Sequence, residues 1–141
     1  MKKYTATHMV KMEDLNHHGS LYAGRAADWL METSFIIATQ EYGEPHGLLY
    51  RNTHSFEFMK PVEPGAIITL EGMIVRAGRT SITMHIRFIN ELTKETHAEA
   101  YTTFVTIDPE TRKPVTHGIQ LDFTGNIKEM EWRNQAEKFF A

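Results

Sequence analysis

The chain has 141 residues, of which 41% are hydrophobic and 23% are charged. This length and composition fit one folded domain, 1–141, and exclude disordered and collagen-like classes. A formal net charge of −3 without a cluster of Lys and Arg argues against nucleic acid as a partner. The absence of cysteine excludes disulfides, thiolate metal sites and a cysteine nucleophile.

The first residues include two lysines, but no apolar segment follows them, so the sequence predicts no secretory signal. No apolar run approaches the roughly 18 residues that a membrane helix needs. We therefore expect a cytoplasmic protein without a membrane partner. The eight histidines include no i, i+4 pair and no HExxH motif, so we also expect no metal site.

The first third of the chain predicts a strand and then one long helix. A short strand is expected over residues 4–10, and a polar turn follows over residues 13–20. Residues 21–42 predict a single helix that Gly43 ends, with Pro45 beyond it. The apolar side chains of this helix cover more than one stripe, which predicts burial on several sides.

The rest of the chain predicts a sheet. Short breaks with turn-forming residues favour antiparallel connections of a meander. A five-stranded antiparallel sheet with one long apolar helix must curl around that helix, which is an α+β architecture. Residues 125–140 are amphipathic and are expected to pack on the outside. The four strands predicted after the helix span residues 49–60, 67–77, 81–91 and 98–108.

The start of the predicted helix carries the clearest chemical signal. Asn16, His18, Gly19 and Gly24 lie at its mouth. The free N–H groups and the dipole of a helix N-terminus stabilise an oxygen that carries negative charge, such as the oxyanion formed from a thioester carbonyl. We therefore treat these four residues as candidate site residues. The alternative is a capped helix with a loop of solvated histidines.

Two carboxylates follow inside the helix. Asp28 and Glu32 are four residues apart and share one face. A carboxylate among apolar side chains needs a partner or a cavity, and it suits a general base that deprotonates water. We expect Glu32, between Met31 and Phe35, to lie deeper than Asp28, which can pair with Arg25. The alternative for both is a solvated polar stripe.

A third candidate region is the turn between two of the predicted strands. It carries Arg76, Arg79, Thr80 and Ser81, which we treat as candidate substrate-binding residues. Guanidinium groups and nearby N–H donors suit phosphate. A plain hairpin with exposed arginines is the alternative.

Four short motifs occur in order between residues 10 and 114. They are Asn-x-x-Gly-x-Leu-x-x-Gly over 16–24 followed by Trp29, Phe-Met-Lys-Pro-Val over 58–62, Gly-Arg-Thr-Ser over 78–81 and Thr-Phe-Val-Thr-Ile-Asp over 103–108. Together these motifs resemble the hotdog-fold acyl-CoA thioesterases. Each motif is weak alone, but their order makes the combined resemblance specific.

The resemblance implies a five-stranded sheet wrapped around the central helix. It also implies a homodimer at least, often a homohexamer built as a trimer of dimers, with active sites at the dimer interface. The implied reaction is hydrolysis of an acyl-CoA thioester, with no cofactor apart from the CoA of the substrate. By match, Asn16 positions the water or the substrate, residues 19–24 polarise the carbonyl, and residues 79–81 lie near the pantetheine or the phosphates.

One position departs from the family pattern. Many members carry a catalytic Asp where this chain has Met31, and the acid here is Glu32, about 100° further round the helix. We therefore predict Glu32 as the base, with Asp28 in reserve. Two other functions stay open: a non-catalytic acyl-CoA-binding protein, in which Met31 marks lost chemistry, and another acyl-thioester enzyme such as a hydratase. The His-containing catalytic loops of such hydratases are missing from the sequence.

Overall fold

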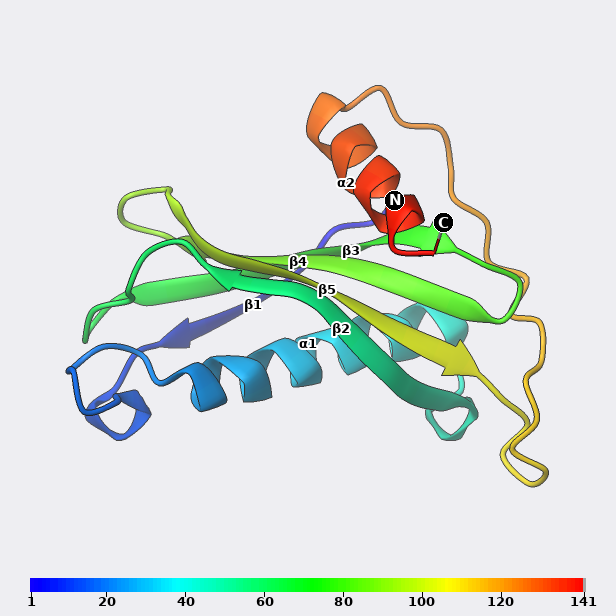
Figure 1. Ribbon diagram of the computed structural model, residues 1–141, viewed down its shortest axis with the longest axis horizontal. Helices are drawn as coiled ribbons and strands as arrows, with labels where there is room; N and C mark the ends of the chain where they lie inside the picture. Colours follow the sequence, from blue (N-terminus) through cyan, green and yellow to red (C-terminus); the bar gives the residue numbers. More distant parts are fainter. Residues whose placement is uncertain (141) are drawn as a thin grey trace.

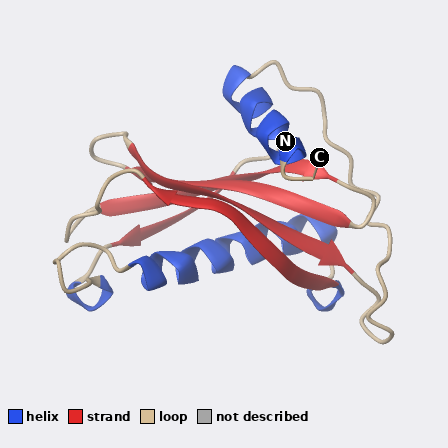
Figure 2. Ribbon diagram, viewed as in Figure 1, coloured by secondary structure: helices blue, strands red, loops and turns tan. Residues whose placement is uncertain are grey.

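The computed structural model describes residues 1–140 and contains a five-stranded antiparallel sheet with a helix on each face (Figures 1 and 2). The long helix α1 runs along one face, and the short helix α2 packs on the other. This arrangement confirms the predicted α+β hotdog architecture. The elements are β1 (Tyr4–Met9), η1 (Met12–Asp14), α1 (Ala23–Tyr42), η2 (Pro45–Gly47), β2 (Leu48–Phe58), β3 (Ile67–Ala77), β4 (Ser81–Asn90), β5 (Thr96–Thr106) and α2 (Ile127–Lys138).

The strand order β1-β3-β4-β5-β2 is only partly the predicted meander. β3, β4 and β5 are consecutive neighbours, but β2 pairs with β5 and forms an edge of the sheet. The segment after β2 does not turn back as a hairpin. Its Val62 carbonyl accepts the Leu21 N–H at 2.8 Å, and its Ala66 carbonyl accepts the Val10 N–H at 2.9 Å. These bonds carry the chain past the start of α1 to the side of the sheet where β1 lies.

The core forms where α1 packs on the inner face of the sheet. Leu30 and Ile37 of α1 are at most 1% exposed, and so are Leu70, Ile86 and Phe88 of the sheet. A glycine in a strand often marks a place where another part of the molecule approaches closely. Gly72 in β3 is such a place, because a Cβ there would lie 2.6 Å from Cδ1 of Ile37.

The ends and the burial of α1 differ in part from the sequence prediction. Gly43 ends the helix as expected, with φ +85° and its N–H donated to the Thr39 carbonyl at 2.7 Å. The prediction of burial on several sides is wrong for the single chain. The sheet covers one side only, so Asp28 and Glu32 are exposed and Phe35 keeps 38% of its surface.

The expectation that residues 125–140 pack on the outside is confirmed. Trp132, Ala136 and Phe139 form a second, smaller core with Met73, Val75 and Tyr101 on the outer face of the sheet. Not every apolar residue of this segment is buried, however. Ile127 remains 73% exposed and Met130 remains 47% exposed.

Candidate active site

The loop before α1 is organised around the Asn16 side chain. Its Oδ1 accepts the backbone N–H groups of His18 at 2.9 Å and Ser20 at 3.2 Å. Gly19 adopts φ +80°, a conformation that a residue with a side chain rarely adopts. This left-handed residue lets the loop fold back so that Ser20 reaches Asn16, while the His18 side chain stays exposed.

A buried carboxylate fixes where α1 begins. Asp14 is 3% exposed, and its carboxylate accepts the Lys11 N–H at 2.8 Å and contacts Nε of Arg25 at 3.1 Å. Its backbone carbonyl takes the N–H of Tyr22 at 2.8 Å. These contacts and the Leu21–Val62 bond keep the chain extended, so α1 starts at Ala23 and not at residue 21. Arg25, which the sequence suggested as a partner of Asp28, therefore pairs with Asp14 instead.

The N-terminus of α1 has no side-chain cap. The first N–H groups of a helix lack intrahelical acceptors. The positive end of the helix dipole is therefore open at Ala23 and Gly24. The missing Cβ of Gly24 matters here, because it would lie 2.4 Å from Cε2 of the Tyr22 ring, which packs beside Gly24.

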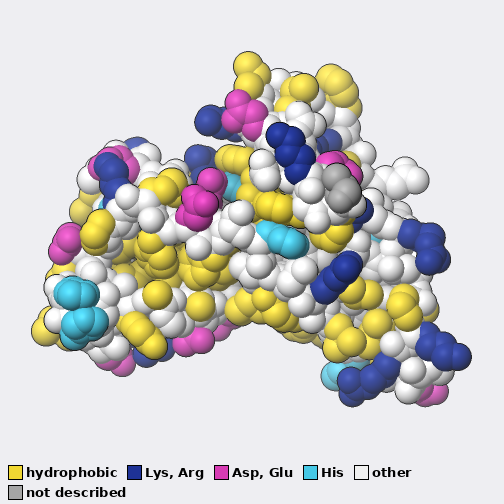
Figure 3. Space-filling model, in the orientation of Figure 1, with side chains coloured by type: hydrophobic (Ala, Val, Ile, Leu, Met, Phe, Trp, Pro, Cys, Tyr) yellow, Lys and Arg dark blue, Asp and Glu magenta, His cyan; other side chains and the backbone are white. Residues whose placement is uncertain are grey.

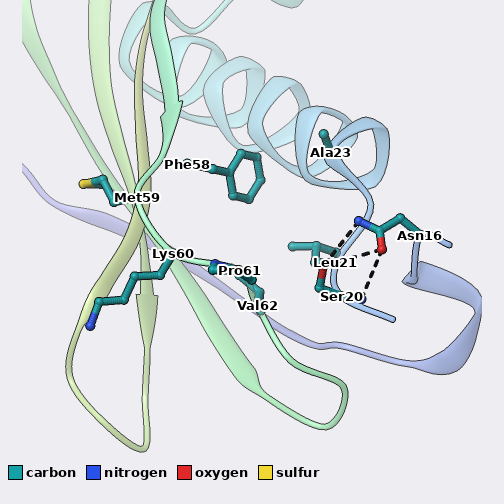
Figure 4. A pocket seen from close by; sticks show the side chains of 9 residues that line it. All are labelled: Asn16, Ser20, Leu21, Ala23, Phe58, Met59, Lys60, Pro61 and Val62. Atoms are coloured by element: carbon teal, nitrogen blue, oxygen red, sulfur yellow. Dashed lines mark hydrogen bonds between the residues drawn. The ribbon is translucent and has the colours of Figure 1, made fainter. Parts of the chain in front are cut away.

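A cavity of about 300 Å³ lies at this open helix end (Figure 4). The loop and the start of α1 supply one wall, and the end of β2 with the following segment supplies the other. Figure 4 shows Asn16 hydrogen-bonded to Ser20 on the loop side and the Phe58 ring facing the helix from the opposite wall. Apolar walls beside a helix N-terminus suit an acyl group whose carbonyl oxygen becomes negatively charged. The lining residues are Asn16, Ser20, Leu21, Ala23, Phe58, Met59, Lys60, Pro61 and Val62.

Neither helix carboxylate borders this cavity. At about 100° per residue, Glu32 lies roughly 180° round the helix axis from the cavity-lining Ala23, and Asp28 lies roughly 140° from it. Burial lowers the pKa of His8 on β1, and the negative charge of Glu32 acts against that shift, which places Glu32 on the β1 side of α1. Glu32 and Asp28 are both exposed in the single chain, so its fold buries neither carboxylate.

The turn from Arg76 to Ser81 lies far from the cavity within one chain. It joins the end of β3 to the start of β4, whereas the cavity lies near the segment that precedes β3. A strand of this length spans roughly 30 Å. The structure therefore separates the predicted substrate-binding residues into two groups at opposite ends of the sheet.

The residues of this distant turn have different environments. Arg79 is exposed and borders a hollow of about 180 Å³ whose other wall is formed by residues 116–120. Thr80 is held by its carbonyl, which accepts the N–H of Thr106 at 2.8 Å. Ser81 is buried, and its Oγ accepts from Nη1 of Arg76 at 3.2 Å. Only Arg79 of these residues presents a free charge to solvent.

Sequence reasoning missed Asp14. The residues of the cavity wall lie within the motifs at 16–24 and 58–62, but the sequence did not show that these two motifs meet. An Asp that follows a turn often accepts a nearby backbone N–H, and the spacing of Lys11 and Asp14 carried that signal. The wall residues Leu21 and Met59 carry no polar group, and only their meeting in space makes them a site. No helix within residues 1–140 is long and apolar enough to cross a membrane.

Comparisons with known proteins agree with this geometry. The thioesterase superfamily model matches residues 18–97. No curated protein matches the chain. Acyl-CoA hydrolase from Staphylococcus aureus, crystallised with butyryl-CoA and CoA, is 24% identical with a TM-score of 0.85, covering 96% of this chain and 80% of that one.

Two further structures have the same fold. A hexameric acyl-CoA thioesterase is 24% identical with a TM-score of 0.83, covering 96% of this chain and 86% of that one. Acyl-CoA hydrolase from Bacillus cereus is 21% identical with a TM-score of 0.85, covering 97% and 83% of the two chains. The family model covers more than half of the sequence, from the loop before α1 to the start of β5. The chain therefore belongs to the thioesterase superfamily and has its hotdog fold.

Proposed function

We propose that this chain hydrolyses acyl-CoA thioesters to a free acid and CoA. The observation that carries the proposal is the uncapped N-terminus of α1, which opens with Asn16 onto an apolar cavity. A thioester places an apolar acyl chain next to a carbonyl that must accept negative charge during hydrolysis. The apolar walls and the positive helix end match these two halves of the substrate.

In the proposed reaction, water adds to the carbonyl carbon and the carbonyl oxygen becomes an oxyanion. The N–H groups at Ala23 and Gly24 stabilise this oxyanion, and the Asn16 amide orients the water or the carbonyl. The C–S bond then breaks, and CoA leaves as a thiolate that takes up a proton. A base removes the proton from the attacking water.

The base is proposed on α1, and the geometry changes the order of the candidates. Asp28 lies three residues before Met31 and shares its helix face, where many members of the family carry the catalytic Asp. Glu32 lies about 100° away from Met31, on the side of β1. We therefore propose Asp28 ahead of Glu32, the reverse of the order that the sequence suggests.

The proposed site is completed by a second copy of the chain. β2 is an edge strand that pairs with β5 on one side and with no strand of the chain on the other. Four large apolar residues on and just beyond it are exposed: Leu49, Tyr50, Phe58 and Met59. Figure 3 shows hydrophobic side chains gathered over β2 and the neighbouring face of α1. An exposed apolar edge invites pairing, and a twofold axis would pair β2 with its own copy in antiparallel fashion.

Antiparallel pairing of β2 would unite the two separated groups of residues. In β2, the Phe58 end borders the Asn16 cavity, whereas the Leu48 end pairs with Thr106, which binds Thr80. The Phe58 end of one copy would face the Leu48 end of the other. The Arg79 turn of one protomer would then reach the cavity of its partner, so that each site uses both chains. A trimer of such dimers is the larger assembly we propose, and one structural neighbour is hexameric.

Thiol release from a panel of acyl-CoAs of different chain lengths tests the activity. Turnover of at least one of them supports the proposal, and CoA binding without any thiol release would instead support the acyl-CoA-binding alternative, for which Met31 is the specific observation. Light scattering tests the assembly, and a stable monomer at micromolar concentration would refute the shared site.

Mixing two defective variants tests the shared site directly. Asn16→Asp and Arg79→Ala chains that exchange subunits form hybrid dimers with one site free of both changes. Random exchange should restore about a quarter of the wild-type sites. No recovery after verified exchange would place both residues in the site of one chain.

A further inference from the structure

The two residues that follow α2, Phe139 and Phe140, pack their aromatic side chains against the outer face of the sheet. Phe139 stacks on His54 of β2, with ring centroids 4.4 Å apart, and meets Tyr101 of β5 edge-on at 5.1 Å. Phe140 contacts the same His54 at 5.9 Å. This contact links α2 to β2, the strand of the proposed dimer edge.

Phe140 also holds the guanidinium group of Arg76. The Arg76 Cζ lies 3.9 Å from the centroid of the Phe140 ring, and the side chain is only 17% exposed. Oε1 of Glu137 lies 3.5 Å from Nε of Arg76, which makes an ion pair without a hydrogen bond. A guanidinium held in this way is not free to bind a phosphate in solvent.

The other edge of the Arg76 guanidinium supports the turn. Nη1 donates to Oγ of Ser81 at 3.2 Å, and Gly78 leaves the space for this contact. A Cβ at Gly78 would lie 2.7 Å from Oγ of Ser81 and 3.0 Å from Nη1 of Arg76. The Gly78 N–H also donates to the Ser81 carbonyl at 2.8 Å, which closes the turn beneath the exposed Arg79.

We propose that Phe140 and Arg76 are positioning residues that hold the Arg79–Ser81 turn in the shape that binds the CoA part of the substrate. The proposal rests on the acyl-CoA hydrolysis proposed above. It divides the two arginines that the sequence grouped together: Arg79 meets the ligand, and Arg76 supports the turn from behind. Phe140 lies outside residues 18–97, whereas Arg76 and the turn lie inside them, so only the aromatic support of the turn is separate from the part of the chain that matches the family.

The test compares two substrates that share an acyl group but differ in the nucleotide. Phe140→Leu keeps an apolar side chain but removes the aromatic face, so the guanidinium loses its cation–π contact. We expect KM for the acyl-CoA to rise roughly tenfold with kcat nearly unchanged. KM for the acyl N-acetylcysteamine thioester, which has no nucleotide, should stay the same. Arg76→Lys should act in the same direction, since an ammonium group cannot span Phe140 and Ser81 together.

Phe123→Leu is the matched control, because Phe123 is 95% exposed and lies outside the contacts described above. It should leave both KM values unchanged. An unaltered KM for acyl-CoA in both Phe140→Leu and Arg76→Lys would overturn the proposal, and so would an equal rise for the two substrates. If thermal melting shows that Phe140→Leu does not fold, the KM values of Arg76→Lys decide whether the proposal holds.

Calorimetric titration with CoA separates this proposal from the proposed function. If the wild type hydrolyses no thioester, acyl-CoA hydrolysis fails, but weaker CoA binding by Phe140→Leu than by Phe123→Leu still supports the positioning role. Equal CoA affinity in these two variants overturns it. A wild type that binds no CoA overturns both proposals.

Discussion

Asn16→Asp separates the structural role of Asn16 from its chemical role. The Oδ1 atom that accepts the His18 and Ser20 N–H groups has an equivalent in Asp, so the loop should keep its shape. The Nδ2 atom, which donates a hydrogen bond to Oγ of Ser20 at 3.3 Å, is replaced by a negatively charged oxygen. The variant therefore removes one N–H donor and adds negative charge where the oxyanion of the proposed reaction forms.

The expected effect follows from those two changes. Loss of one donor to an oxyanion costs about 10²- to 10³-fold in kcat, about 3–4 kcal/mol of transition-state stabilisation. A carboxylate near the start of α1 contributes about 0.3–1 kcal/mol of stability through the helix dipole. Activity should thus fall sharply while the melting temperature stays level or rises.

Thiol-release kinetics with the best acyl-CoA and thermal melting check this pair of effects. Asn90→Asp is the matched control, because Oδ1 of Asn90 accepts the N–H groups of Leu92 and Thr93 in a similar turn that does not line the cavity. It should change kcat by less than about twofold. If Asn16→Asp keeps kcat within about threefold of wild type, Asn16 is only a loop acceptor and the catalytic reasoning is refuted.

Three further changes test the base, the core and the pH dependence. Asp28→Asn should lower kcat about 10²- to 10⁴-fold, whereas Glu32→Gln should lower it less than about tenfold. If steady-state kinetics give the opposite ranking, Glu32 is the base. Gly72→Ala places a Cβ 2.6 Å from Cδ1 of Ile37 and should lower the free energy of unfolding by about 1–3 kcal/mol through overpacking. Urea unfolding measures this loss, and unchanged stability would mean that α1 can shift away from β3. Burial lowers the pKa of His85. Below about pH 6.5 this histidine is therefore protonated in the unfolded chain more than in the folded chain, and the free energy of unfolding should fall on acidification. His85→Gln should flatten that fall in urea titrations between pH 7.5 and 5.5, and an equally steep fall in the variant would assign it to other groups.

Local sequence signals predicted the elements whose ends depend on neighbouring residues. Gly43 ends α1 because a left-handed residue there costs glycine little. The bounds of β3 match the prediction from Ile67 to Ala77, because turn-forming residues flank an apolar, β-branched segment. The helix-start motif also pointed to the correct end of α1 for the cavity.

The start of α1 and the pairing of β2 depended on distant residues. The extended conformation at Leu21 and Tyr22 is imposed by Val62 and Asp14, and local propensity does not contain those bonds. β2 pairs with β5 because the following segment is bound to the start of α1 and to Val10. A short break between two strands predicts a hairpin only when nothing else binds the break.

The direction of each candidate side chain was decided by the tertiary structure alone. Asp28 and Glu32 share a helix face in the sequence, but which face the sheet covers is set by packing, and it leaves both exposed. Arg76 and Arg79 belong to one turn, yet one is enclosed by Phe140 and the other is exposed. Sequence spacing determines the angle between two side chains on an element, whereas their surroundings come from residues that are remote in the chain and close in space.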